Sequence, residues 1–250
     1  MAAFNSAVDA GADGVEFDVR LSADEVPMVI HDRTLQRTGA RRDTVSSLTA
    51  DQLAEIDVGS WFNRKWPDKT RVEFSAECIP TLEQVLTKLS DLKGLIYVEL
   101  KIDDDPAGLV NAVAEVIRSS PLLERIIVKS FCLAAIHEIC RLVPDVQTAA
   151  LFEPSVMKML RKKRYILSVA RDVGADQLSL HRSLASSKLV RHALDAGMPV
   201  TIWTADSVKW LKRCQIRGIG ALITNDPQKL LAARTDQESL ADSSMPRSLS

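Results

Sequence analysis

Short apolar runs recur along the chain, and turn-forming residues bound each of them. Segments with the apolar spacing of amphipathic helices separate most of these runs. Thr49 and Thr81 each begin a Thr-x-x-Gln capping box at the start of such a segment. Regular alternation of strands and helices is typical of a parallel sheet with helical crossovers. The predicted strands are GVEFDV (14–19), GLIYVELK (94–101), RIIVKSF (125–131), VQTAALF (146–152), ADQLSL (175–180), PVTIWTA (199–205) and GALIT (220–224).

The strand count and the length indicate one barrel. A (β/α)8 barrel has eight strands and takes about 250 residues, which is the length of this chain. Seven strands are visible, and a helical pattern at 2–10 precedes them, so we expect a TIM (β/α)8-type barrel whose first strand is missing. Residues 1–234 would form this barrel domain. Residues 235–250 contain no aromatic residue and are expected to be a disordered tail.

The first visible strand is followed by a segment that does not fit the parallel series. VPMVIHD (26–32) comes too soon for a helical crossover, so we expect it to fold back as a hairpin arm. With the turn centred just after Ala23, Glu16 would lie opposite His31. Strand side chains alternate between faces, so Glu16, Asp18 and His31 would then share one face.

A long insertion, residues 33–80, follows this arm and contains GSWFNRKWPDK (59–69). Long loops at one end of a barrel commonly carry function, so we predict that the insertion forms a lid over the site. Trp61 and Phe62 are expected to pack the apolar interior of this lid.

Composition narrows the class of protein. The chain is 46% hydrophobic and 26% charged, with a net charge of −1, which is typical of a soluble globular protein. Nucleic acid is not an expected partner, because a phosphate backbone requires a basic face. No apolar run is long enough to span a membrane, so stable membrane insertion is not expected. Cys78, Cys132, Cys140 and Cys214 are scattered, which favours reduced thiols and a cytoplasmic location.

The candidate chemistry lies on the two strands nearest the hairpin arm. Glu16 and Asp18 share one strand face, and Glu99 and Lys101 repeat this spacing on the next barrel strand. Buried carboxylates repel one another, and a divalent cation would relieve the repulsion. Three carboxylates without clustered His or Cys favour Mg²⁺ or Ca²⁺. A cation and a lysine suit a phosphate oxygen, and His31 suits proton transfer, so the set indicates phosphoester chemistry.

Each of these residues also has a structural interpretation when taken singly. Glu16 or Asp18 alone is equally suited to be a paired structural carboxylate. Lys101 alone would serve as the ion-pair partner of Glu99, and a lone His31 is more often a hydrogen-bonded core histidine. The pattern as a set favours a functional site.

The residues that carry the chemistry belong to longer motifs. A-x-x-x-G-A-D-G-V-E-F-D-V-R-L-S-x-D-x-V-P-x-V-I-H-D (7–32) resembles the glycerophosphodiester phosphodiesterase family. The resemblance covers nearly all of residues 2–230, and it is closest to the short bacterial members. It implies a TIM barrel that hydrolyses small-molecule glycerophosphodiesters to sn-glycerol 3-phosphate and an alcohol with Mg²⁺ or Ca²⁺. Its other motifs are D-x-G-S-W-F (57–62), I-P-T-L-E-Q-V-L (79–86), V-E-L-K (98–101), S-F (130–131), W-T-A-D (203–206) and L-I-T-N-D-P (222–227).

The resemblance also implies roles for single residues. The metal ligands of the family fall on Glu16, Asp18 and Glu99. His31 corresponds to one of two acid/base histidines, and Lys101 corresponds to a lysine that contacts phosphate. Trp203 would wall the substrate pocket near the glycerol, or would simply be a packed aromatic at the barrel mouth. Ser130 and Phe131 match a family motif, but we assign them no chemistry.

The sequence also departs from the family pattern. The motifs His-Arg-Gly and Pro-Glu-Asn-Thr would supply the other catalytic histidine, a phosphate-binding arginine and a further metal-ligand glutamate, and the sequence contains neither. We therefore expect impaired activity. Among the other histidines, His181 follows a predicted strand and is a weak candidate near the barrel mouth. Asn225 stands where the family more often has Asp.

Two alternative functions remain open. The aromatic and basic residues of WFNRKW (61–66) would suit a lysophospholipase D-type enzyme that acts on longer lipids, and binding to anionic liposomes would favour it. A non-catalytic truncated barrel is the second alternative. Without a first strand, the edges of GVEFDV and GALIT would be unpaired, and unpaired edges favour self-association.

Overall fold

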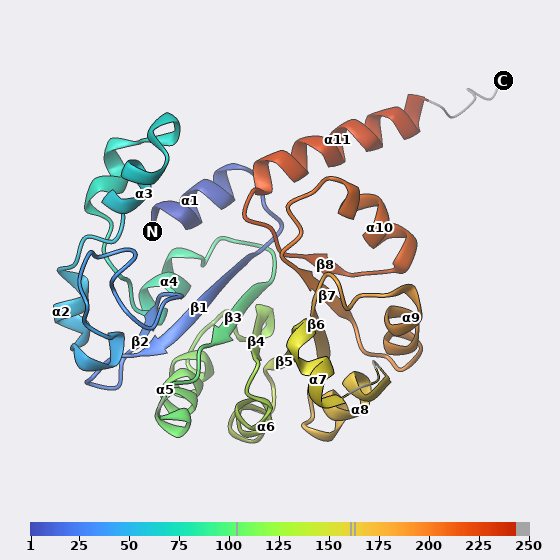
Figure 1. Ribbon diagram of the computed structural model, residues 1–250, viewed down its shortest axis with the longest axis horizontal. Helices are drawn as coiled ribbons and strands as arrows, with labels where there is room; N and C mark the ends of the chain where they lie inside the picture. Colours follow the sequence, from blue (N-terminus) through green and yellow to red (C-terminus); the bar gives the residue numbers. More distant parts are fainter. Residues whose placement is uncertain (104, 161, 163, 244–250) are drawn as a thin grey trace.

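The computed structural model describes residues 1–103, 105–160, 162 and 164–243, and its centre is a curled sheet (Figure 1). Seven strands run parallel, each beside the next one along the chain, as the sequence predicts. The hairpin arm, β2 (Pro27–Val29), pairs antiparallel with the first of them. The parallel strands are β1 (Val15–Leu21), β3 (Ile96–Leu100), β4 (Ile126–Ser130), β5 (Gln147–Phe152), β6 (Gln177–His181), β7 (Val200–Trp203) and β8 (Ala221–Leu222).

Helices surround the outer face of this sheet, which is the arrangement of a TIM-type barrel (Figure 1). Short 3₁₀ turns, η4 (Leu123–Arg125) and η5 (Pro154–Val156), lie in the loops between strands and helices. The helices are α1 (Ala2–Asp9), α4 (Leu82–Lys88), α5 (Pro106–Arg118), α6 (Leu133–Leu142), α7 (Met157–Leu160), α8 (Arg164–Asp172), α9 (Ser187–Asp195), α10 (Lys209–Arg217) and α11 (Pro227–Ser243). Residues 235–243 are thus helical where the sequence suggested a disordered tail, and 244–250 lie outside the described residues.

Alternation along the strands separates an apolar outer face from a polar inner face. Val15, Phe17 and Val19 of β1 pack outward with residues of α4, α5 and α6 in one large hydrophobic cluster. The inner face carries a smaller cluster, and the hydroxyl groups of Tyr97 on β3 and Thr201 on β7 share a 3.1 Å hydrogen bond across the curl. Packing against the helices on the outer face therefore stabilises the sheet, and the charged side chains of the strands lie on its inner face.

The insertion, residues 33–80, packs against the hairpin arm. Met28 and Ile30 join Leu53 and Ile56 in a separate hydrophobic cluster, and the capping boxes predicted at Thr49 and Thr81 are both formed. A second group of rings packs Trp61, Phe62, Trp66 and Phe74, which confirms the predicted apolar packing of Trp61 and Phe62. The helical elements of the insertion are η1 (Val45–Ser47), α2 (Ala50–Ala54), α3 (Ser60–Lys65), η2 (Pro67–Lys69) and η3 (Val72–Ala76). The role of the insertion as a lid stays a prediction.

The hairpin register differs by one residue from the predicted one. Val19 pairs with Val29, and the amide of Ile30 donates to the carbonyl of Asp18 at 2.9 Å, so Ile30 lies opposite Asp18. The cause is Glu25, which has a φ of 63°. A left-handed residue after a tight turn adds one residue to the loop and shifts the pairing. The predicted pairing of Glu16 with His31 is therefore wrong.

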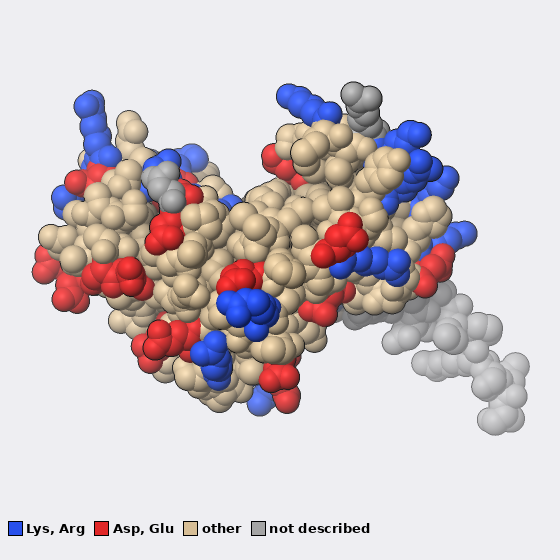
Figure 2. Space-filling view, turned by 90° about the horizontal axis from the view of Figure 1, so that it is seen from below, with Lys and Arg blue, Asp and Glu red and all other residues tan. Residues whose placement is uncertain are grey.

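Charged side chains are mixed over the surface that Figure 2 shows. Acidic and basic groups are interspersed on this face, which agrees with the net charge of −1. Within the described ranges, no helix has both the length and the apolar character needed to cross a membrane.

The β1–β3 register depends on a close backbone contact at the start of the two strands. A methyl group on Gly94 would lie 1.2 Å from the carbonyl oxygen of Asp13. We expect Gly94→Ala to lower the free energy of unfolding by about 1–3 kcal/mol or more, as overpacking does. Gly220→Ala is the matched control, because the nearest atom to its methyl group would be 4.0 Å away. Equal urea midpoints for the two variants would contradict this prediction.

Candidate active site

The pairing register of β1, β3 and β4 places charged residues of these three adjacent strands side by side. Asp18 of β1 pairs with Glu99 of β3, and Glu99 pairs with Lys129 of β4. Glu16 lies two residues before Asp18, so both side chains point to the inner face. The strand order and the alternation of side chains together produce the cluster.

The three carboxylates form a compact set of oxygen donors. One oxygen from each of Glu16, Asp18 and Glu99 lies within 4.8 Å of the other two. Burial raises the pKa of Glu16, and the charges of Asp18 and Glu99 raise it further, although the ammonium of Lys129 opposes them. Carboxylates that repel one another at this distance fit an oxygen-preferring cation, which would lower the cost of keeping them ionised. The predicted metal ligands thus lie together.

Two lysines pair with these carboxylates. Lys101 lies 3.1 Å from Asp18 Oδ1 and also contacts Glu99 Oε1, and its side chain is 18% exposed. Burial lowers the pKa of Lys101, but the charges of Asp18 and Glu99 outweigh it and raise the pKa overall. Lys129 lies 2.6 Å from Glu16 Oε1 and 3.3 Å from Glu99 Oε2.

Lys129 is the site residue that the sequence analysis missed. It stands inside an apolar run, IIVKS, and its side chain is only 2% exposed. A lysine in the middle of a buried strand is as unexpected as Glu16 or Asp18, because Lys is almost never fully buried unless it is paired. That rule is the sequence signal that could have found it.

Aromatic rings continue the site across the barrel mouth. Lys101 Nζ lies 5.9 Å from the ring centre of Phe131, and the Phe131 ring packs against Trp203 at 5.6 Å. His181, which the sequence analysis placed near the mouth, packs its ring against Trp203 at 5.3 Å. Burial, and then the charge of Arg182, lower the pKa of His181. Among the described residues, no partner accepts a hydrogen bond from the buried indole nitrogen of Trp203.

His31 lies just beyond β2, and its side chain is 62% exposed. Its Nδ1 lies 2.7 Å from Asp32 Oδ1, and Arg37 donates to the other oxygen of Asp32 at 2.5 Å. The hydrogen bond from Arg37 lowers the pKa of Asp32 against the effect of burial, and His31 lowers it further. Asp32 thus orients the imidazole, because a hydrogen bond at one ring nitrogen fixes the direction in which the other ring nitrogen points. The described contacts include none between this ring and the three carboxylates.

Polar side chains fix the loops at the mouth. The Ser130 hydroxyl donates to the Leu100 carbonyl at 3.0 Å and accepts from the Cys132 amide at 3.1 Å. The end of β3, just before Lys101, is therefore tied to the start of α6. This contact gives the S-F motif a structural role.

Asp206 ties together the loops that follow β7 and β8. Its carboxylate accepts hydrogen bonds from the Thr224 hydroxyl and from the backbone and side-chain nitrogens of Asn225. Asp206 does not cap α10, because the N-cap of that helix is Val208. The Asn225 side chain is a donor to Asp206, a role that an ionised Asp at this position would lack.

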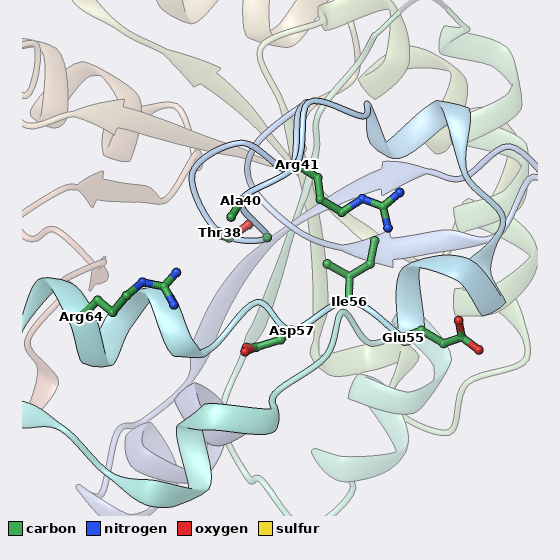
Figure 3. Close-up of a pocket in the computed structure, with 8 residues that line it drawn as sticks. Thr38, Ala40, Arg41, Glu55, Ile56, Asp57 and Arg64 are labelled. Atoms are coloured by element: carbon green, nitrogen blue, oxygen red, sulfur yellow. The ribbon is translucent and has the colours of Figure 1, made fainter.

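A separate hollow of about 310 Å³ lies in the insertion, where the loop before η1 meets α2 and α3 (Figure 3). Basic and acidic groups both line it, and none of the predicted site residues does. Its lining residues are Thr38, Gly39, Ala40, Arg41, Glu55, Ile56, Asp57 and Arg64.

Comparison with known proteins gives consistent matches. Residues 1–229 match the family described as the glycerophosphoryl diester phosphodiesterase family. A glycerophosphodiester phosphodiesterase of Caldanaerobacter subterraneus subsp. tengcongensis is 28% identical over 239 residues, which cover 92% of this chain and 89% of the relative.

Solved structures share the fold. A phosphodiesterase of Oleispira antarctica, solved in complex with the product sn-glycerol-3-phosphate, has a TM-score of 0.80 at 24% identity and covers 94% of this chain and 90% of its own. A glycerophosphodiester phosphodiesterase of Parabacteroides distasonis has a TM-score of 0.73 at 24% identity, covering 95% of this chain and 89% of its own. The likeness to these two structures establishes the barrel fold.

We expect Ser130→Ala to lower the free energy of unfolding by about 1–3 kcal/mol, because the Cys132 amide and the Leu100 carbonyl would lose a buried partner. Urea unfolding followed by circular dichroism measures this change. Ser168→Ala, at an exposed position of α8, is the control and should leave the midpoint unchanged. A Ser130→Ala midpoint equal to that of the control would show that the contact contributes nothing.

Proposed function

Because the chain belongs to the glycerophosphoryl diester phosphodiesterase family, we propose that it hydrolyses glycerophosphodiesters to sn-glycerol 3-phosphate and an alcohol. The observation that carries the proposal is the cluster of Glu16, Asp18, Glu99 and Lys101 on the inner face of the barrel sheet. The relative solved with sn-glycerol-3-phosphate supports the product.

Glu16, Asp18 and Glu99 are the residues that would hold Mg²⁺ or Ca²⁺. All three offer carboxylate oxygens, the ligands that both ions prefer. When bound, such a cation supplies a positive charge that polarises the phosphoryl oxygens.

Lys101 is the proposed phosphate-binding residue. Its ammonium is partly exposed and lies between the carboxylates and the Phe131 ring, so it can contact a phosphate oxygen while Asp18 and Glu99 keep it charged. Trp203 would wall the pocket on the glycerol side, with Phe131 and His181 packed against its ring.

His31 is the proposed acid/base group. Asp32 holds its Nδ1, which leaves Nε2 to exchange a proton with an ester oxygen. We favour in-line attack by the neighbouring glycerol hydroxyl on phosphorus. The hydroxyl forms a new bond to phosphorus and releases its proton to solvent water, and the bond from phosphorus to the alcohol oxygen breaks as His31 protonates that oxygen, which leaves a cyclic phosphate. A water molecule then attacks phosphorus and returns a proton to His31, and the ring opens to sn-glycerol 3-phosphate with a solvent proton on the released oxygen.

The proposed location is the cytoplasm. Cys78, Cys132, Cys140 and Cys214 are unpaired in the structure, and reduced thiols are typical of that compartment. A lysophospholipase D-type activity on longer lipids remains the second candidate, since Trp66 and Val72 of the insertion are 37% and 87% exposed beside basic residues.

The first experiment measures release of sn-glycerol 3-phosphate from glycerophosphocholine with Mg²⁺, with Ca²⁺ and with EDTA. We expect metal-dependent release that falls about 10²–10⁴-fold in His31→Ala, the range for loss of an acid/base group. His192→Ala, at an exposed position of α9, is the matched control. No release from folded protein would contradict the proposed function, and faster turnover of lysophosphatidylcholine would favour the lipid enzyme.

Self-association is a further part of the proposal. The predicted free edge of GVEFDV is only partly present, because β2 pairs with Val19–Leu21 of β1. In the described part of the sheet no ladder joins β8 to β1, so the start of β1 and the outer side of β8 lack a strand neighbour, although an ion pair of 2.6 Å links Arg234 of α11 to Asp13 before β1. Unpaired strand edges favour pairing between chains. We expect light scattering to give a mass above that of one chain, whereas a monodisperse monomer that unfolds cooperatively would contradict this expectation.

A further inference from the structure

Lys129 is enclosed among the carboxylates that would hold a divalent cation. Its ammonium contacts one oxygen of Glu16 at 2.6 Å and one oxygen of Glu99 at 3.3 Å, and its side chain is 2% exposed. β4 pairs with β3 on one side and with β5 on the other, so the Lys129 backbone is fixed. The ammonium therefore has no solvent route by which to leave these two carboxylates.

The two lysines of the cluster differ in this respect. Lys101 is 18% exposed, follows the end of β3 and contacts the Phe131 ring at the mouth, so it can turn toward a substrate. Lys129 lies within β4 and faces two candidate metal ligands at once. Only Lys101 is placed to bind phosphate, and Lys129 needs another explanation.

The charges of the cluster suggest that explanation. When all five groups are ionised, Glu16, Asp18 and Glu99 contribute −3 and the two lysines contribute +2, which leaves −1. Without Lys129 the same set would carry −2 and would attract a divalent ion more strongly. Removing Lys129 would also leave Glu16 without its ion pair, at a cost in stability.

We propose that Lys129 is an internal counterion with two effects on the site. It keeps Glu16 and Glu99 assembled without a divalent cation, and it weakens the binding of that cation by competing for the same carboxylates. Lys129 is thus a positioning residue that sets metal affinity. This inference rests on the proposed function, because it takes Glu16, Asp18 and Glu99 as the metal ligands.

The test compares metal affinity and stability in the same variants. Lys129→Met removes the charge and keeps a long side chain, and Lys129→Gln removes the charge but keeps a hydrogen-bond donor. Lys188→Met is the matched control, because Lys188 is exposed on α9. Titration calorimetry with MgCl₂ and CaCl₂ gives the affinities, and thermal unfolding in EDTA gives the stability of the metal-free protein.

We expect Lys129→Met and Lys129→Gln to bind Mg²⁺ or Ca²⁺ about 10- to 100-fold more tightly than the wild type. Loss of a group bonded to metal ligands commonly weakens binding by a factor of this size, but here the lost group carries a positive charge that repels the cation, so the direction is reversed. Both variants should have a lower Tm in EDTA and a larger gain in Tm when the metal is added. A purely structural role for Lys129 would lower the Tm in EDTA without tightening metal binding. The Lys188→Met control should match the wild type in both measurements.

Unchanged or weaker affinity in both Lys129 variants would overturn the inference, as would a failure of every form to bind either ion. If Lys129→Met does not fold in EDTA, recovery of its circular dichroism spectrum on adding Ca²⁺ supports the inference. The metal affinity is then compared between Lys129→Gln and the wild type. The proposed function is judged separately. If the wild type hydrolyses the substrate but the Lys129 variants bind metal no more tightly than it does, only the counterion role is refuted. If the variants bind metal more tightly but the wild type releases no product, only the proposed activity is refuted.

Discussion

The structure depends on one constraint, which is that the carboxylates buried on the inner face of the sheet must be compensated by opposite charges. Glu16, Asp18 and Glu99 lie within 4.8 Å of one another, in a barrel where unpaired carboxylates would resist burial. Lys101 and Lys129 supply the opposite charges from neighbouring strands. Removing one partner of such a set leaves a buried charge without compensation, which costs far more than a surface ion pair contributes.

The outer face of the sheet supplies the rigidity that this arrangement needs. The outward side chains of β1, β3 and β4 pack with α4, α5 and α6, so their inward neighbours have fixed directions. Ser130 and Asp206 then tie the ends of the strands to the loops at the mouth. Hydrophobic burial on the outer face of the sheet thus fixes the positions of the charged side chains on its inner face.

The hairpin arm shows how a local backbone feature redirects a functional residue. Glu25 adopts a positive φ, and the pairing of β1 with β2 shifts by one residue as a result. His31 therefore leaves the ladder with its ring exposed, and Asp32 and Arg37 orient it instead of Glu16. The geometry of this side chain therefore depends on the turn and on the hydrogen bonds with Asp32 and Arg37.

The sequence by itself determined the seven parallel strands, the hairpin arm, the two capping boxes and the alternation that places Glu16 and Asp18 on one face. These features depend on residues that are close in the chain, so their patterns are visible in it. Only the tertiary structure decided that Lys129 joins the carboxylates, that His181 packs on Trp203 and that the hairpin slips by one residue. Such contacts depend on which strands become neighbours and on the backbone conformation of one turn residue, and neither is encoded in a local pattern.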